Sequence, residues 1–296
     1  NVDGFDYSDP DVEWSKRPEI DRWILSLLNS LVKDVDGYLE AYEPTRAGRA
    51  ISDFVNDNLS NWYVRLNRRR FWGGGMTEDK LSAYQTLYTC LETVAKLMAP
   101  IAPFYADQLF LDLVAVTGRE NVESVHLSDF PVYDESKIDK NLEERMQMAQ
   151  DVSSMVNIKV RQPLHTVMIP VVDAHQQESI EAVKNLILNE VNVKELKFVD
   201  NTAGILVKKI KPDFKKLGPR YGKIMKALAA TIQSMSQEDI NAFEKAGTFT
   251  LMVDGQEAVL ERTDVEIISE DIPGWLVANE GRLTVALDIT VTEDLR

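Results

Sequence analysis

Apolar residues recur at helical spacing through the first half of the chain. They repeat every three or four positions in four segments, which prolines and glycines separate. Pro44 ends the first segment, because the residue before a proline disfavours helical backbone angles, and the glycines at 73–75 end the second. The pattern predicts an all-α helical bundle with helices at residues 21–42, 45–71, 78–98 and 105–116.

The pattern changes after one further long helix, which we predict at residues 142–160. Runs of β-branched apolar residues then alternate with shorter helical segments, and Asp254-Gly255 between two apolar runs indicates a hairpin. The fold class that follows is multidomain, an all-α helical bundle followed by a mixed α/β C-terminal region. We predict strands at residues 166–172, 194–199, 204–210, 248–253, 258–261, 265–268 and 283–291, and helices at 176–189, 218–234 and 237–246.

Three domains follow from this change of pattern. A length of 296 residues fits two or three domains of ordinary size. We expect a helical bundle over residues 1–145, a small α/β subdomain after a linking helix over 146–210, and a C-terminal α/β subdomain over 211–296. The chain begins without an initiator Met and ends without a Gly, a Pro or a polar tail, so we interpret both ends as cuts in a longer chain.

Composition excludes several classes of protein. There is no run of about 18 apolar residues and the start is acidic and polar, so we expect neither a membrane span nor a signal peptide. Cys90 is the only cysteine and lies in a helical apolar pattern, which predicts a buried thiol in a reducing cytoplasm. One cysteine and three scattered histidines cannot supply a thiolate zinc site, so we expect no metal.

The net charge of −15 disfavours nonspecific binding to nucleic acid, so RNA contact requires local basic patches. Residues 61–72 carry four arginines and no acid. Guanidinium groups bind phosphates, amides pair with base edges, and aromatic rings stack on unpaired bases. Equally, the helix dipole alone favours arginines near a helix C-terminus. At 3.6 residues per turn one stripe would contain Asn58, Asn61, Arg65, Arg68 or Arg69, and Trp72, whereas Trp62 lies on the apolar face.

A family resemblance favours the RNA interpretation. Residues 54–65 and the run Arg68-Arg69-Arg70-Phe71-Trp72 resemble the second helix of the anticodon-binding domain of isoleucyl-tRNA synthetases, which are class I aminoacyl-tRNA synthetases. Residues 21–25 resemble the first helix of that domain, and residues 97–104 resemble its proline-kinked segment. Asp107-Gln108 stand where the family often has a Glu pair, which puts a specific role for that position in doubt.

Two further basic segments follow. Residues 158–164 resemble the segment that leads into an extra C-terminal region in this family, and Lys159 and Arg161 lie there near a helix end. The helix dipole explains these two cations at least as well as contact with the anticodon stem does. Residues 205–226 carry eight basic residues and one acid, which favours phosphate contact over a merely solvated face. The candidate tRNA-binding residues are Asn58, Asn61, Arg65, Arg68, Arg69, Trp72, Lys159, Arg161, Lys208, Lys209, Lys215, Lys216 and Arg220.

The resemblance implies the anticodon-recognising part of an enzyme that attaches isoleucine to tRNA(Ile) using ATP and Mg²⁺. The HIGH-like and KMSKS-like signatures of class I catalysis are missing, so we expect no catalytic residue and no cofactor in this fragment. Catalytic and editing domains on the N-terminal side would be its partners in cis. The alternatives are the same region of a valine or leucine synthetase, or a non-enzymatic protein-interaction module, which an exposed apolar patch would indicate.

Overall fold

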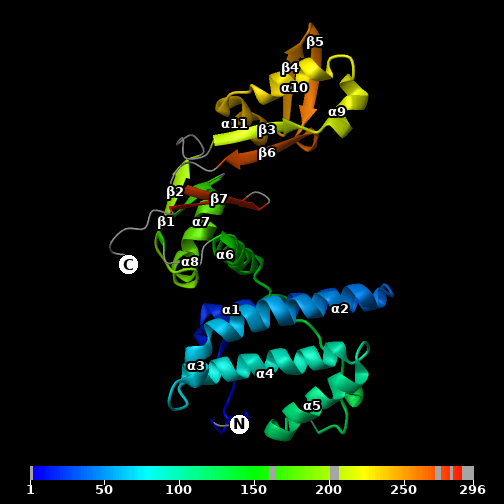
Figure 1. The fold of residues 1–296 in the computed structure, drawn as a ribbon. Helices are drawn as coiled ribbons and strands as arrows, with labels where there is room; N and C mark the ends of the chain where they lie inside the picture. The colour runs from blue at the N-terminus through cyan, green and yellow to red at the C-terminus, as the bar shows by residue number, and fades with distance from the viewer. Residues whose placement is uncertain are drawn as a thin grey trace. The chain divides into compact units, whose positions relative to one another are not determined.

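The computed structural model of the chain describes residues 3–119, 121–159, 164–171, 173–200, 207–270, 275–280 and 283–288. Contacts along the chain divide it into two compact units, Asn1–Glu144 and Arg145–Arg296. The first unit is helical and the second mixes helices with strands, which confirms the predicted fold class (Figure 1). A further division at residue 210 stays a prediction; that residue lies within strand β3 (Val207–Pro212).

In the first unit, α1 and α2 lie along one side of α4, and α5 lies along the other (Figure 1). The predicted bundle is therefore confirmed. Trp23 and Ile24 of α1 are buried in it, and Cys90 of α4 is fully buried, as predicted. The elements are η1 (Trp14–Lys16), α1 (Glu19–Glu40), α2 (Pro44–Asp53), η2 (Phe54–Val64), α3 (Arg68–Trp72), α4 (Glu78–Met98), α5 (Pro103–Thr117), η3 (Val125–Leu127), η4 (Glu135–Lys137) and the start of α6 (Lys140–Lys159).

The second predicted helix is not one continuous α-helix. After α2 the backbone becomes a π-helix, η2, and a turn at Asn67 separates it from α3. Two side chains donate hydrogen bonds to backbone carbonyls here. Arg65 Nε donates to the Asn61 carbonyl at 2.6 Å, and Asn67 Nδ2 donates to the Tyr63 carbonyl at 2.7 Å. Such bonds compete with the regular helical ladder, which apolar spacing alone does not reveal.

The second unit contains a four-stranded sheet, in the order β2-β1-β8-β7, and two two-stranded sheets, β3-β6 and β4-β5. Strands β1 and β2 are parallel, and α7 and α8 form the crossover connection that a parallel pair requires, while the other pairs are antiparallel. The elements are β1 (Leu164–Val171), α7 (Ala174–Ala182), α8 (Lys184–Val191), β2 (Val193–Asp200), β3, α9 (Phe214–Tyr221), α10 (Met225–Gln233), α11 (Gln237–Ala246), β4 (Thr248–Val253), β5 (Gln256–Glu261), η5 (Arg262–Asp264), β6 (Val265–Glu270), β7 (Trp275–Glu280) and β8 (Leu283–Asp288).

Helices α10 and α11 pack against β3 and β4 in this unit. Leu217, Leu228, Ile232 and Phe243 are fully buried in the core that they share with the strands. The alternation along β3 follows from this packing: Ile210 is buried, whereas Lys209 and Lys211 are exposed.

Two predictions for this unit are wrong. The helix predicted at residues 218–234 is two helices, and Pro219 lies inside α9 rather than at a helix start. Asp213 begins α9 instead, because its carboxylate accepts the Lys215 backbone N–H at 2.9 Å and so caps the first turn. The helix predicted at 176–189 likewise divides at Val183, and strand β7 was not predicted at all.

No helix in the described parts of the chain is both long enough and apolar enough to span a membrane.

Candidate nucleic-acid interface

A buried ion pair attaches the basic segment α3 to the rest of the first unit. Arg70 donates to both carboxylate oxygens of Asp21, at 2.7 and 2.9 Å, and its Nε donates to Asp79 at 2.9 Å. Asp21 is fully buried and also accepts hydrogen bonds from Tyr63 at 2.8 Å and Ser82 at 2.5 Å. Burial alone would lower the pKa of Arg70, but its bonds to Asp21 raise that pKa well above the usual value. Arg70 therefore anchors α3 to α1 and α4.

Arg68, Arg69 and Trp72 lie on the solvent side of the same short helix. Trp72 is 80% exposed, and both arginines are exposed. Within the described residues, neither guanidinium group has a hydrogen-bond or ion-pair partner. While Arg70 holds the helix in place, α3 presents two guanidinium groups and an indole to solvent. These groups can bind phosphates and stack on unpaired bases.

The rest of the predicted stripe is arranged differently. Arg65 is exposed, but its Nε donates to the Asn61 carbonyl, and its guanidinium lies 5.9 Å from the centroid of the Trp62 ring. Trp62 is buried, as predicted, and Asn58 is half-buried. In the π-helix η2 each N–H bonds to the fifth residue back, so a periodicity of 3.6 does not apply. The predicted stripe is therefore not continuous.

Sequence analysis missed the structural role of Arg70, although the chain contains a signal for it. Asp21 lies at helical spacing before Ile24, Leu25 and Leu28, all of which are buried. A carboxylate on a buried face requires a charged or hydrogen-bonding partner. The spacing could therefore have predicted a polar or charged partner for Asp21, but not that Arg70 supplies it.

Lys208, a predicted phosphate contact in the second unit, has its side chain buried in that unit. Lys208 is only 9% exposed. Its ammonium donates to Asn241 Oδ1 at 3.1 Å and forms an ion pair with Glu244, both on α11. Because Lys208 and Ile210 alternate with exposed residues on β3, they face the helices together. Lys208 thus holds α11 onto β3 in this structure.

Arg220 is a second predicted contact that is engaged within its own unit. Its Nη1 donates to Asp264 Oδ2 at 2.7 Å, and its Nη2 donates to the Val259 carbonyl at 2.9 Å. The hydrogen bond to Asp264 raises the pKa of Arg220. Arg220 therefore joins α9 to β5 and η5.

The remaining predicted cations have different placements. Lys209, Lys215 and Lys216 are exposed, and the Lys216 ammonium donates to the Thr263 carbonyl at 2.8 Å. Lys159 is the last residue of α6, whereas Arg161 lies outside the described residues. Three of the predicted lysines of the second unit are therefore exposed on β3 and α9.

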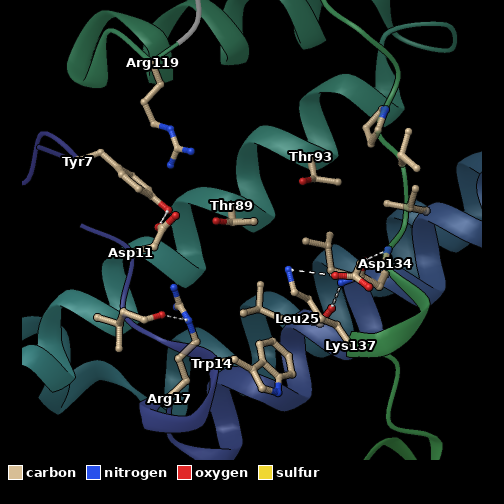
Figure 2. Close-up of a pocket in the computed structure, with 16 residues that line it drawn as sticks. Tyr7, Asp11, Trp14, Arg17, Leu25, Thr89, Thr93, Arg119, Asp134 and Lys137 are labelled. Atoms are coloured by element: carbon tan, nitrogen blue, oxygen red, sulfur yellow. Dashed lines mark hydrogen bonds and ion pairs between the residues drawn. The ribbon is translucent and has the colours of Figure 1, made fainter. Parts of the chain in front are cut away.

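A cavity of about 390 Å³ in the first unit was not predicted (Figure 2). The Tyr7 hydroxyl donates to Asp11 at 2.7 Å, and Arg17 Nε donates to the Val12 carbonyl at 3.1 Å. The Arg119 guanidinium points toward Tyr7 and lies 3.8 Å from the centroid of the Tyr7 ring (Figure 2). Because these polar groups bind one another, we interpret the cavity as part of the packing of the N-terminal segment.

An apolar groove of about 330 Å³ lies between α2, η2, α4 and α5, with Ile51, Val94 and Leu109 among its lining residues. Tyr105, which is 63% exposed, also lines the groove, and its neighbour in the chain, Phe104, is 91% exposed. Contiguous exposed apolar surface marks a contact with other molecules. The first unit therefore also has the feature that indicates a protein contact.

Comparison with known proteins shows which kind of domain contains the basic segment α3. Residues 21–166 match the family described as the anticodon-binding domain of tRNA ligase. About half of the chain is thus similar to this anticodon-binding domain. Over its whole length it is 69% identical to the isoleucine–tRNA ligase of Bacteroides thetaiotaomicron, 66% to that of Porphyromonas gingivalis and 54% to that of Cytophaga hutchinsonii.

The chain spans about a quarter of the length of these ligases, 26% to 27%. Helix α3 lies within the matched anticodon-binding domain, whereas the lysines of β3 and α9 lie beyond it. The full-length identity nevertheless includes both units. In the described residues, no His, Cys, Asp and Glu side chains gather in a group that could hold a metal ion.

Proposed function

We propose that this chain recognises the anticodon region of tRNA(Ile) within an isoleucine–tRNA ligase. One observation carries the proposal: α3 exposes Arg68, Arg69 and Trp72 inside the anticodon-binding domain of a chain with net charge −15. Similarity over the whole chain to isoleucine–tRNA ligases favours isoleucine over valine or leucine.

In this proposal each exposed group has its own role. Arg68 and Arg69 bind phosphates of the anticodon loop, and Trp72 stacks on an unpaired base. Asn61 and Arg65 lie before them in the chain and remain candidates, together with Asn58 and Lys159. In the second unit, Lys209, Lys215 and Lys216 supply further phosphate contacts.

Aminoacylation itself is proposed for the whole ligase. The relatives are about four times as long as this chain. ATP and Mg²⁺ chemistry is proposed for the whole ligase in the same way. The catalytic and editing domains are the proposed partners in cis, and the cytoplasm is the proposed location.

The test is a titration of the chain with tRNA(Ile) and tRNA(Val) at several salt concentrations. Changing Arg68 and Arg69 to Ala is expected to weaken binding of tRNA(Ile) and to reduce the slope of log K against log salt by about 0.7 to 0.9 per lost contact. Arg49→Ala is the matched control, because Arg49 is also exposed and has no partner among the described residues. Binding and slope should hardly change in the control.

Trp72→Ala tests the aromatic part of the interface. Loss of base stacking is expected to weaken binding by about 1–3 kcal/mol without changing the salt slope. Phe104→Ala removes another strongly exposed ring of the first unit, beside the apolar groove, and should leave tRNA binding unchanged. If neither the arginines nor Trp72 affected tRNA binding, the protein-contact function indicated by the groove would be the better explanation of this unit.

A further inference from the structure

A phenyl ring is exposed at the first turn of α9. Phe214 is 58% exposed, although helical spacing puts it on the same stripe as Leu217 and Tyr221. Leu217 is fully buried, and Tyr221 packs against the core of the second unit. Among the described residues, Phe214 is not part of that core. The ring is therefore available to another molecule, and its removal should have little effect on the fold.

Positive charge surrounds this ring in the sequence and on the adjoining strand. Residues 209–216 contain four lysines and one acid, Asp213, whose carboxylate is used to cap α9. All four lysines are exposed. Glu266 of β6 lies opposite Lys211, and no ion pair joins the two in the described structure. The segment that contains Phe214 thus carries a net positive charge within a strongly acidic chain.

An exposed ring among ammonium groups fits an RNA strand better than an RNA duplex. In a duplex the faces of the bases are stacked on one another, whereas an unpaired base offers a free π face. Sites for single strands combine a cationic track for the phosphates with aromatic rings on which bases stack. Lysines alone would bind either form, so the ring is what distinguishes them.

We propose that Phe214 stacks on an unpaired base of an RNA strand whose phosphates lie along the exposed lysines of β3 and α9. The second unit then binds single-stranded RNA rather than a stem. The inference rests on the proposed function for its substrate class, which is RNA, and it adds a residue and a preferred RNA form that the family match at 21–166 does not include.

The experiment uses the full chain and a short labelled RNA strand without secondary structure, alone or annealed to its complement. All variants also carry Arg68→Ala and Arg69→Ala, so that α3 does not mask the second unit. Phe214→Ala is expected to weaken binding of the strand about five- to a hundredfold, with an unchanged salt slope and unchanged duplex binding. Phe214→Trp should retain strand binding.

Two controls separate the contribution of the Phe214 ring to binding from that of the lysine charges. Met252→Ala truncates another apolar side chain of the second unit, 68% exposed on β4, and should have no effect. Lys215→Ala should reduce the salt slope for the strand by about 0.7. No strand binding, no loss with Phe214→Ala, or an equal loss for strand and duplex would overturn the inference.

A different result would reject the proposed function without rejecting the stacking role of Phe214. That proposal is judged by tRNA(Ile) binding to the chain with intact α3. If tRNA(Ile) bound no better than tRNA(Val) while Phe214→Ala still weakened strand binding, the tRNA specificity would be rejected and the stacking role would stand.

Discussion

Arg70 shows how much one side chain contributes to the stability of the fold when its ion-pair partner is buried. Asp21 has no exposed surface, so removing the Arg70 guanidinium leaves a buried carboxylate that keeps its hydrogen bonds from Tyr63 and Ser82 but has no cation. Breaking a buried pair in this way costs about 3–5 kcal/mol. Arg70→Ala is therefore expected to lower the free energy of unfolding of the first unit by roughly that amount, measured by urea unfolding followed by tryptophan fluorescence.

Arg68→Ala is the control for this prediction, because Arg68 is exposed and has no partner among the described residues. Its effect on unfolding should stay within about 0.5 kcal/mol. Equal stabilities for the two variants would show that Arg70 is not an anchor. The pair of variants also separates stability from tRNA binding, since Arg68 is expected to affect only the latter.

Three consecutive arginines look alike in the sequence, yet one is structural and two are exposed. The distinction depends on Asp21, which is far away in sequence and reaches α3 only through the packing of α1. The same limit applied to Lys208, whose partners Asn241 and Glu244 lie on α11. Local composition predicted where the charges gather, but long-range contacts decide which of them are available.

At the scale of elements, the π-helix η2 is the clearest departure from the predicted pattern. Hydrogen bonds to the fifth residue are rare in proteins and occur mostly as single turns within α-helices. We expect the backbone amides of η2 to exchange with solvent faster than those of α4, which is regular and capped by Thr77. Hydrogen-exchange mass spectrometry of the free chain measures this directly, and equal protection of the two helices would contradict it.

Apolar periodicity predicted α1, α4 and α11 well because each has a long stripe facing a core. It failed where local hydrogen bonds decide the backbone, as at Asn67 and at the Asp213 cap. Strand β7 was missed because its sequence, WLVANE, has only a short apolar run, and its pairing with β8 supplies the rest.

At the scale of the whole molecule, a net charge of −15 makes RNA recognition a local property. Acidic surface repels phosphates at long range, so only places where cations outnumber acids can hold RNA. Helix α3 and the junction of β3 with α9 are two such places, one in each unit. The acidic remainder disfavours nonspecific binding to nucleic acid.

The two units should also unfold separately, because each buries its own apolar core. Phe110 of α5 and Phe243 of α11 are both fully buried, one in each unit. Replacing a buried Phe with Ala costs about 3–5 kcal/mol through lost burial and the cavity that remains. Phe110→Ala should therefore lower the urea midpoint of the first unit alone, and Phe243→Ala that of the second. Hydrogen exchange in urea assigns each transition to its residues, and a shift of both transitions by either variant would mean that the units unfold as one.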